Sequence, residues 1–222
     1  MNHIRLFLAL FCTLLLVVSC TKVKHEYHKN GKLKSETHYR FGKETGTTIH
    51  YHSWYPTKVL EVEMKKGKKN GKLIKRYFDN NIELIAYYKN DLLEGVETYY
   101  YKNGNRSMET HYTKGIKNGP VTSWYYNGVI KESGTFVNNL FEGNWENYDE
   151  RGLLTGEGSF VQGTGRRITY DEMGRLQGET HFVNNKKEGW ETHYYPSGEI
   201  KDTILFKEDR IIKINDIYVE DL

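Results

Sequence analysis

The chain has 222 residues, of which 27% are charged and 37% are hydrophobic, and its formal net charge is +3. It contains 18 Tyr and 21 Gly but only two alanines, Ala9 and Ala86. Alanine favours helices and tyrosine favours strands, so this composition argues against a mainly helical domain. The nearly balanced charge argues against a highly charged disordered tail. We therefore expect an all-β, turn-rich protein.

The first twenty residues have the pattern of an export signal. Arg5 supplies a positive charge, and an apolar run from Leu6 to Val18 follows it. This run is shorter than the roughly 20 apolar residues that span a bilayer. It ends in Val17-Val18-Ser19-Cys20, which resembles a bacterial lipobox. The resemblance implies that residues 1–19 are removed and that Cys20 is lipidated. The alternative is a buried strand or helix with an incidental cysteine.

Lipidation at Cys20 carries predictions about the mature protein. Cys12 lies in the removed segment, so the mature chain would have no free thiol and no disulfide. Several acyl chains anchor a protein stably without spanning the membrane. We expect residues 20–24 to form a lipidated tether. No Asp stands beside Cys20, which resembles the sorting pattern of the outer membrane, so we expect a bacterial cell-envelope protein held there.

One residue position recurs along almost the whole mature chain. The recurring side chains are aromatic or large and apolar, and they are spaced by 22 to 25 residues: Tyr39, Met64, Tyr88, Tyr112, Phe136, Phe160, Phe182 and Phe206. A glycine follows most of them, and a second aromatic column, which includes Tyr100, Trp124 and Tyr148, follows the glycines. A fixed period of this kind is typical of repeat proteins. We expect about eight units of about 24 residues over residues 25–210.

Each unit has the pattern of a β-hairpin. The pairs Asn30-Gly31 and Asn103-Gly104 predict tight hairpin turns, because both residue types tolerate positive φ. A unit then consists of a strand, a tight turn, a second strand and a polar loop. One hairpin is marginally stable alone, so the units are expected to stack into an elongated sheet. Residues 211–222 are rich in β-forming residues and are the expected C-terminal β cap.

Several segments resemble the MORN-repeat variant of YwqK-type antitoxin proteins. They include Tyr99–Gly104, Trp124–Gly128 and Tyr194–Gly198, and the resemblance extends over about residues 25–210. It implies an elongated stack of β-hairpins, no enzymatic activity in the repeats, and an antitoxin-like or immunity-like role. The unit that contains Tyr55-Pro56-Thr57-Lys58 departs most from the pattern, because it lacks the Asn-Gly turn.

Nine histidines raise the question of a metal site. His38, His111 and His181 occupy the same position in different units, so they lie too far apart to share a metal whose ligands are about 2 Å away. We expect them to be solvated or cross-strand side chains, with no metal and no cofactor. A surface metal site is the alternative for four N-terminal histidines: His25, His28, His50 and His52.

No sequence motif indicates catalysis. The chain has no Gly-x-Ser-x-Gly nucleophile elbow, and no helical pattern follows its glycine-rich segments as a phosphate-binding loop requires. A flat ribbon also offers no obvious cleft for a pair of carboxylates. We expect a protein that is not an enzyme.

Charge is distributed unevenly along the chain. Residues 22–76 carry 15 Lys and Arg against 5 Asp and Glu, a net charge of +10, whereas residues 77–222 carry 16 against 24, a net charge of −8. The densest basic run contains Lys65, Lys66, Lys68 and Lys69. These lysines are either solvated loop residues or a membrane-facing patch, where each adds about 1 kcal/mol of attraction to anionic lipids. Nucleic acid is an unsuitable partner for an exported chain whose other repeats are acidic.

Two functional hypotheses follow. The first is a protein–protein interaction module, because aromatic residues dominate binding hot spots. Its expected recognition surface consists of outward-facing aromatic residues outside the two columns: Tyr99, Tyr101, Tyr125, Trp145, Trp190 and Tyr195. The second is a structural scaffold or a membrane-surface binder that uses the basic N-terminal third. Exposed sheet edges leave a homo-oligomer open under both hypotheses.

Overall fold

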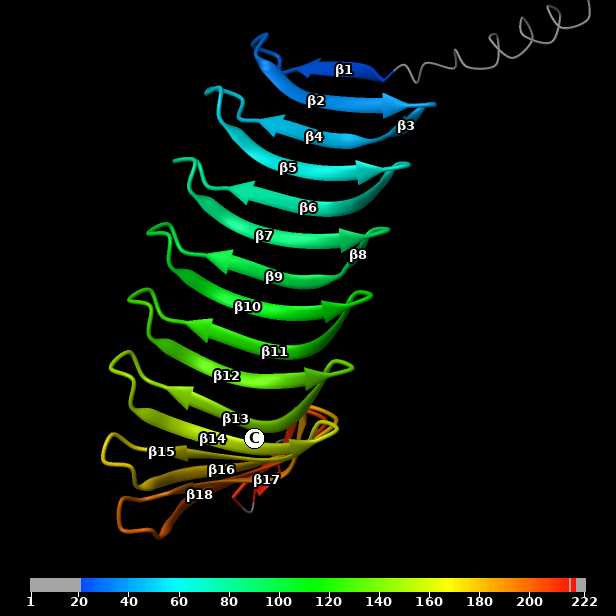
Figure 1. The fold of residues 1–222 in the computed structure, drawn as a ribbon. Helices are drawn as coiled ribbons and strands as arrows, with labels where there is room; N and C mark the ends of the chain where they lie inside the picture. The colour runs from blue at the N-terminus through cyan, green and yellow to red at the C-terminus, as the bar shows by residue number, and fades with distance from the viewer. Residues whose placement is uncertain (1–20, 216, 219–222) are drawn as a thin grey trace, which may run out of the picture.

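The computed structural model describes residues 21–215 and 217–218 and places them in one open sheet (Figure 1). Twenty strands form the sheet, and every pair of neighbouring strands is antiparallel. The all-β stack of hairpins expected from the sequence is confirmed. No helix in this described part is long and apolar enough to cross a membrane. The expected signal peptide and Cys20 lie outside the described residues.

The strands follow one another in chain order across the sheet, as Figure 1 shows. The first ten are β1 (Lys22–Tyr27), β2 (Leu33–Arg40), β3 (Lys43–Glu44), β4 (Gly46–Tyr51), β5 (Lys58–Lys65), β6 (Lys68–Arg76), β7 (Ile82–Lys89), β8 (Leu92–Leu93), β9 (Gly95–Tyr100) and β10 (Arg106–Thr113). The other ten are β11 (Ile116–Trp124), β12 (Ile130–Val137), β13 (Leu140–Tyr148), β14 (Leu154–Val161), β15 (Thr164–Tyr170), β16 (Leu176–Val183), β17 (Lys186–Tyr194), β18 (Ile200–Lys207), β19 (Arg210–Ile214) and β20 (Ile217–Tyr218).

The sheet extends into both segments expected at the ends of the repeat array. Strand β1 begins at Lys22 and pairs with β2 from Lys22 opposite Tyr39 onward. Residues 22–24 of the expected tether therefore belong to the sheet by their backbone. At the other end, β19 and β20 continue the sheet into the expected cap.

The two long edges of the sheet carry turns of different length. The Asn-Gly pairs were predicted to form the tight turns, but they lie in the wider turns. The Asn-Gly pairs lie in five-residue turns such as Tyr101–Asn105, in which Gly104 has φ 88°. Asn103 instead accepts a hydrogen bond from the Asn105 N–H at 3.0 Å, an Asx turn. Two-residue turns lie at the opposite edge, where both residues have positive φ, as in Asn138 (52°) and Asn139 (68°). We call these the wide-turn edge and the tight-turn edge.

The two aromatic columns lie on opposite faces of the sheet. Side chains alternate between faces along a strand, so the first face carries Phe136 and Phe160, and the second face carries Trp124 and Tyr148. Phe160 pairs with Gly143 of the neighbouring strand, which leaves room for its ring. The buried apolar core lies on the first face in two clusters: Val62, Leu73 and Ala86, and further along Phe136, Trp145 and Phe160.

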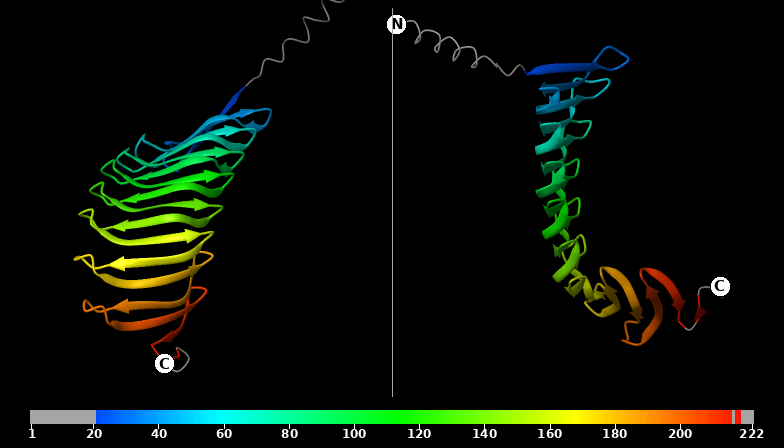
Figure 2. Two further views of the ribbon diagram at one scale, coloured as in Figure 1. Left: turned by 60° about the horizontal axis from the view of Figure 1, so that its bottom comes forward. Right: turned by 90° about the vertical axis from the view of Figure 1, so that its right-hand side faces the viewer.

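The sheet is a nearly straight stack at its N-terminal end and bends in its C-terminal third (Figure 2). The bend coincides with the unit that is two residues shorter than the others. Its hairpin β14–β15 has no register shift, whereas β12–β13 and β16–β17 each contain one. Asn185 bridges this short unit at the tight-turn edge. Its side-chain oxygen accepts from the Phe141 N–H at 2.8 Å, and its amide nitrogen donates to the Asn139 carbonyl at 2.7 Å.

Candidate functional site

The expected recognition surface does not form one face. Trp145 is the clearest departure, because it is 2% exposed and packs against Phe136 and Phe160. The prediction that Trp145 faces outward is wrong. It lies an odd number of positions before Tyr148, which puts it on the first face with the core. Gly134 makes room for it, since a Cβ atom there would lie 2.2 Å from the indole ring.

Tyr101 and Tyr125 are partly buried at the wide-turn edge, where they join successive units. The hydroxyl of Tyr101 donates to the Trp124 carbonyl at 2.7 Å, and that of Tyr125 donates to the Tyr148 carbonyl at 2.9 Å. Tyr77 makes the equivalent bond to the Tyr100 carbonyl at 2.7 Å. We call these three residues the tyrosine staples. The prediction that Tyr101 and Tyr125 face outward fails, because their hydroxyls hold the stack together.

Tyr99, Trp190 and Tyr195 are exposed, as expected, but they are dispersed. Tyr99 lies on the first face opposite Leu84. Trp190, which is 43% exposed, lies on the second face opposite Leu205. Tyr195 follows β17 in the last wide turn. These three side chains therefore do not make one continuous patch.

A carboxylate lies among tyrosines on the first face, around β9. Burial raises the pKa of Glu97, and hydrogen bonds from Tyr112 and Tyr99 only partly oppose this effect. Burial, followed by the negative charge of Glu97, raises the pKa of Tyr112 to about 12. Folding therefore disfavours the ionised form of Glu97 relative to the unfolded chain.

A cluster of exposed aromatic residues lies at the N-terminal part of the wide-turn edge and was not anticipated. Trp54, Tyr55 and Phe78 are exposed, Trp54 by 65%; we call them the wide-turn aromatic cluster. The rings of Tyr55 and Phe78 meet edge to face with centroids 5.1 Å apart, and His52 lies 5.0 Å from Phe78. The replacement of the Asn-Gly turn by Trp54-Tyr55-Pro56 was the sequence signal for it.

This cluster adjoins a groove of about 470 Å³. Its lining residues come from the first two wide turns and the strands beside them: Lys32, Leu33, Tyr51, His52, Tyr55 and Pro56. Contiguous exposed apolar side chains beside a groove are typical of interaction sites. Aromatic side chains are also the commonest anchors of protein interfaces.

The basic run lies at the tight-turn edge. Lys65, Lys66 and Lys68 are exposed, as expected. Lys69 is partly buried, with its ammonium 4.8 Å from the centre of the Tyr88 ring. The expected four-lysine patch therefore has three members directed to solvent and one that packs on the sheet.

Phe41 lies beside these lysines and is 75% exposed. It occupies a tight turn at φ 50°, a position that polar residues or lysine fill in the other tight turns. A groove of about 460 Å³ surrounds it, lined by Arg40, Phe41, Lys43, Thr45, Lys65 and Lys66. Because β1 begins opposite Tyr39, the chain enters the sheet at this same edge. The wide-turn aromatic cluster lies on the opposite edge.

The repeated histidines have a structural role, as expected. His38, His111 and His181 each donate from Nδ1 to a carbonyl of the neighbouring strand, at 3.0, 3.0 and 3.2 Å. The accepting carbonyls belong to Thr47, Pro120 and Trp190. Each of these residues directly follows a glycine with positive φ. Among residues 21–215 and 217–218, no group of three or more His, Cys, Asp or Glu side chains could hold a metal ion.

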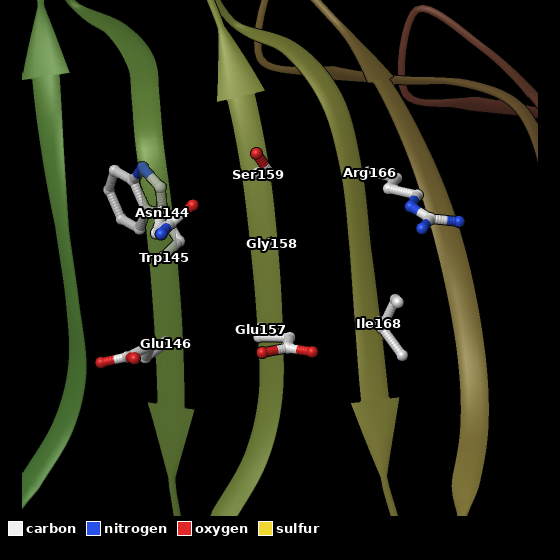
Figure 3. A pocket seen from close by; sticks show the side chains of 8 residues that line it. All are labelled: Asn144, Trp145, Glu146, Glu157, Gly158, Ser159, Arg166 and Ile168. Carbon is white, nitrogen blue, oxygen red and sulfur yellow. The ribbon is translucent and has the colours of Figure 1, made fainter.

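A small hollow of about 210 Å³ lies over β13, β14 and β15 (Figure 3). Glu146 and Glu157 lie directly opposite each other in it. Each accepts a hydrogen bond from a tyrosine hydroxyl, Glu146 from Tyr148 at 2.9 Å and Glu157 from Tyr170 at 2.6 Å. Arg166 pairs with Glu179 of the next strand at 3.1 Å. The Tyr170–Glu157 and Arg166–Glu179 contacts are cross-strand pairs of a sheet surface, whereas Tyr148 and Glu146 lie on the same strand.

Comparison with known proteins supports the repeat assignment. The family model described as MORN repeat variant matches residues 26–40, 93–114 and 117–138. No curated protein matches the chain. MORN repeats are generally protein- or membrane-interaction modules. The three matched segments are similar to MORN-variant repeats, and they lie within one continuous array of stacked hairpins.

Proposed function

We propose that this protein is a non-enzymatic, lipid-anchored repeat protein of the bacterial cell envelope that binds a protein partner. The observation that carries the proposal is the wide-turn aromatic cluster, in which Trp54, Tyr55 and Phe78 are exposed and Tyr55 lines a groove. Burying such side chains against a partner stabilises a complex by about 1.5–3 kcal/mol each before the costs of association. A partner that is a toxin would give the protein an immunity role.

The position of the cluster suits a tethered protein. A lipid on Cys20 would hold the protein at its tight-turn edge, because β1 enters the sheet there. The wide-turn aromatic cluster would then be directed away from the membrane. Both faces of the single-layer sheet would also remain accessible to a partner.

Partner capture from membranes of the source cell tests this proposal. The lipidated protein serves as bait and is cross-linked before solubilisation, and the bound proteins are identified by mass spectrometry. We expect one stoichiometric partner, which disappears when Trp54, Tyr55 and Phe78 are all replaced by Ala. The matched control is Tyr126→Ala, since Tyr126 is an exposed wide-turn aromatic residue outside the cluster. Identical recovery with both variants would contradict the proposal. Labelling with radioactive palmitate, lost in Cys20→Ala, tests the anchor.

A second candidate function is membrane-surface binding through the tight-turn edge. It is favoured by Phe41, whose exposed ring lies between cationic side chains in one groove. Apolar side chains that enter the interface and lysines that attract anionic lipids act together in peripheral binding. The test uses protein that lacks the first 20 residues and vesicles with or without anionic lipid. We expect binding to anionic vesicles alone, weakened by Phe41→Ala; equal binding to both vesicles would contradict it.

A further inference from the structure

The tyrosine staples stop at the unit where the sheet bends. Tyr77, Tyr101 and Tyr125 join consecutive units by donating to a carbonyl of the next one. Asp149 and Asp171 occupy the equivalent position in the next two units. Tyrosine hydroxyls therefore join successive units at the wide-turn edge up to β13, and aspartates stand at the equivalent position in the two units after it.

Both aspartates turn back onto their own turns. Asp149 Oδ1 accepts from the N–H groups of Arg151 and Leu153, each at 2.9 Å, and Asp149 Oδ2 accepts from the Arg151 guanidinium. Asp171 makes the same pattern with its own turn, including a bond of 2.9 Å from the Arg175 N–H. Neither side chain reaches the next unit in these hydrogen bonds.

A groove opens where the first missing staple would lie. It has a volume of about 500 Å³ and lies between the turn that follows β13 and the turn that follows β15. Leu153, Leu154 and Met173 line it and are exposed, Met173 by 79%. Tyr170, whose carbonyl corresponds to the acceptors of the staples, also lines it.

The charge of the two turns favours a cationic partner. Asp149 and Asp171 are each paired with an arginine of their own turn, at 2.7 Å in both cases. Arg151 also lies 3.7 Å from Glu172 of the next turn. Glu150 and Glu172 are both exposed, and with them each turn keeps a net charge of −1. Opposite charge at the rim of an interface steers association and fixes its orientation.

We propose that this groove binds a tyrosine side chain flanked by lysines or arginines in an extended segment of a partner protein. The tyrosine ring would lie against Leu154 and Met173 in the space that a staple fills in the preceding units. Its hydroxyl would donate to the Tyr170 carbonyl, as the Tyr125 hydroxyl donates to the Tyr148 carbonyl. The flanking cations would face Glu150 and Glu172. The inference rests on the proposed function as a protein-binding module and adds a second contact site to it.

Synthetic peptides and NMR spectroscopy test the proposal on the protein lacking its first 20 residues. The probe is a peptide with the core Lys-Lys-Tyr-Lys-Lys, and its controls replace Tyr by Ala or all Lys by Glu. We expect saturable shifts of the backbone amides of Leu153, Leu154, Met173 and Gly174. The affinity should fall about ten-fold with either control peptide.

A variant that fills the groove sharpens the test. Asp149→Tyr would restore a staple in the space between the two turns, so it should abolish the shifts. Met173→Ala, at an exposed position, should weaken binding several-fold even if Asp149→Tyr does not fold. No saturable shift at the groove, or shifts that persist in folded Asp149→Tyr, would overturn the inference. Neither result would affect partner capture by the wide-turn aromatic cluster.

Discussion

Asn185 lies so close to Gly163 that a Cβ atom on Gly163 would stand 2.6 Å from the Asn185 side-chain oxygen. This close approach lets Asn185 reach past the short unit and bond to Phe141 and Asn139. Gly163 also has φ 74°, a conformation that costs other residues about 1–2 kcal/mol. The contact between these two residues fixes the tight-turn edge at the bend.

We predict that Gly163→Ala destabilises the C-terminal units by about 2–3 kcal/mol, the sum of the backbone cost and a lost hydrogen bond. Gly67→Ala is the matched control, because Gly67 has φ 80° in a tight turn with open space around it. It should cost about 1–2 kcal/mol. Urea denaturation with hydrogen exchange at β16 and β17 measures both. Equal losses in the two variants would contradict this account of the bend.

Trp145 and Trp190 should differ strongly in their contribution to stability. Trp145→Ala removes a buried core side chain and should cost about 3–5 kcal/mol. Trp190→Ala alters an exposed position and should cost less than about 1 kcal/mol. Chemical denaturation measures both values. Trp145→Phe should be milder than Trp145→Ala, because the buried indole Nε1 has no hydrogen-bond partner among the described residues. A larger loss at Trp190 would show that the faces are assigned wrongly.

The tyrosine staples should stabilise the array through their hydroxyls. Tyr101→Phe and Tyr125→Phe each remove one hydrogen bond to a neighbouring unit and should cost about 0.5–1.5 kcal/mol. Tyr126→Phe serves as the control, since Tyr126 is exposed in the same turn as Tyr125. Thermal unfolding followed by circular dichroism provides the comparison. If Tyr126→Phe is as destabilising as the staple variants, the hydroxyl bonds are not the cause.

Glu97 should make stability depend on pH in a direction unusual for a carboxylate. Burial raises its pKa in the folded protein above the unfolded value, so folding favours the protonated form. Its contribution to stability is therefore greatest below the unfolded pKa and declines as the pH rises through the folded pKa. Glu97→Gln should raise the Tm by a few degrees at pH 7 and have little effect at pH 4. A Tm that falls at pH 7 would contradict the prediction.

The fold was predictable because two periodicities agree along the chain. The step of about 24 residues defines the hairpins, and alternation within strands defines the faces. The same alternation assigns Trp145 to the core and Trp190 to the opposite face, although the two were predicted to share one recognition surface. The prediction assigned the tight turns to the wrong edge, because the Asn-Gly pairs were expected to form them. Asn103 instead uses its side chain to stabilise a wide turn, which the Asn-Gly pair alone does not reveal.

The contacts between units were less predictable. The Tyr125 hydroxyl meets a carbonyl 23 residues away, and only stacking of the hairpins brings the two together. The wide-turn aromatic cluster likewise depends on how Tyr55 and Phe78 meet across neighbouring turns. Phe41 could have been found by aligning the tight turns, since an aromatic residue stands there in place of a polar one.

The central claim is that the exposed wide-turn edge binds a protein partner in the cell envelope. Site-specific photo-cross-linking in the source cell tests it most directly, with the photoreactive residue placed at Trp54 and, as the control, at the exposed Val161 of β14. We predict a discrete cross-linked species from position 54 that is absent from position 161. A cross-linking pattern that is the same at both positions, or no discrete species from position 54, would contradict the claim.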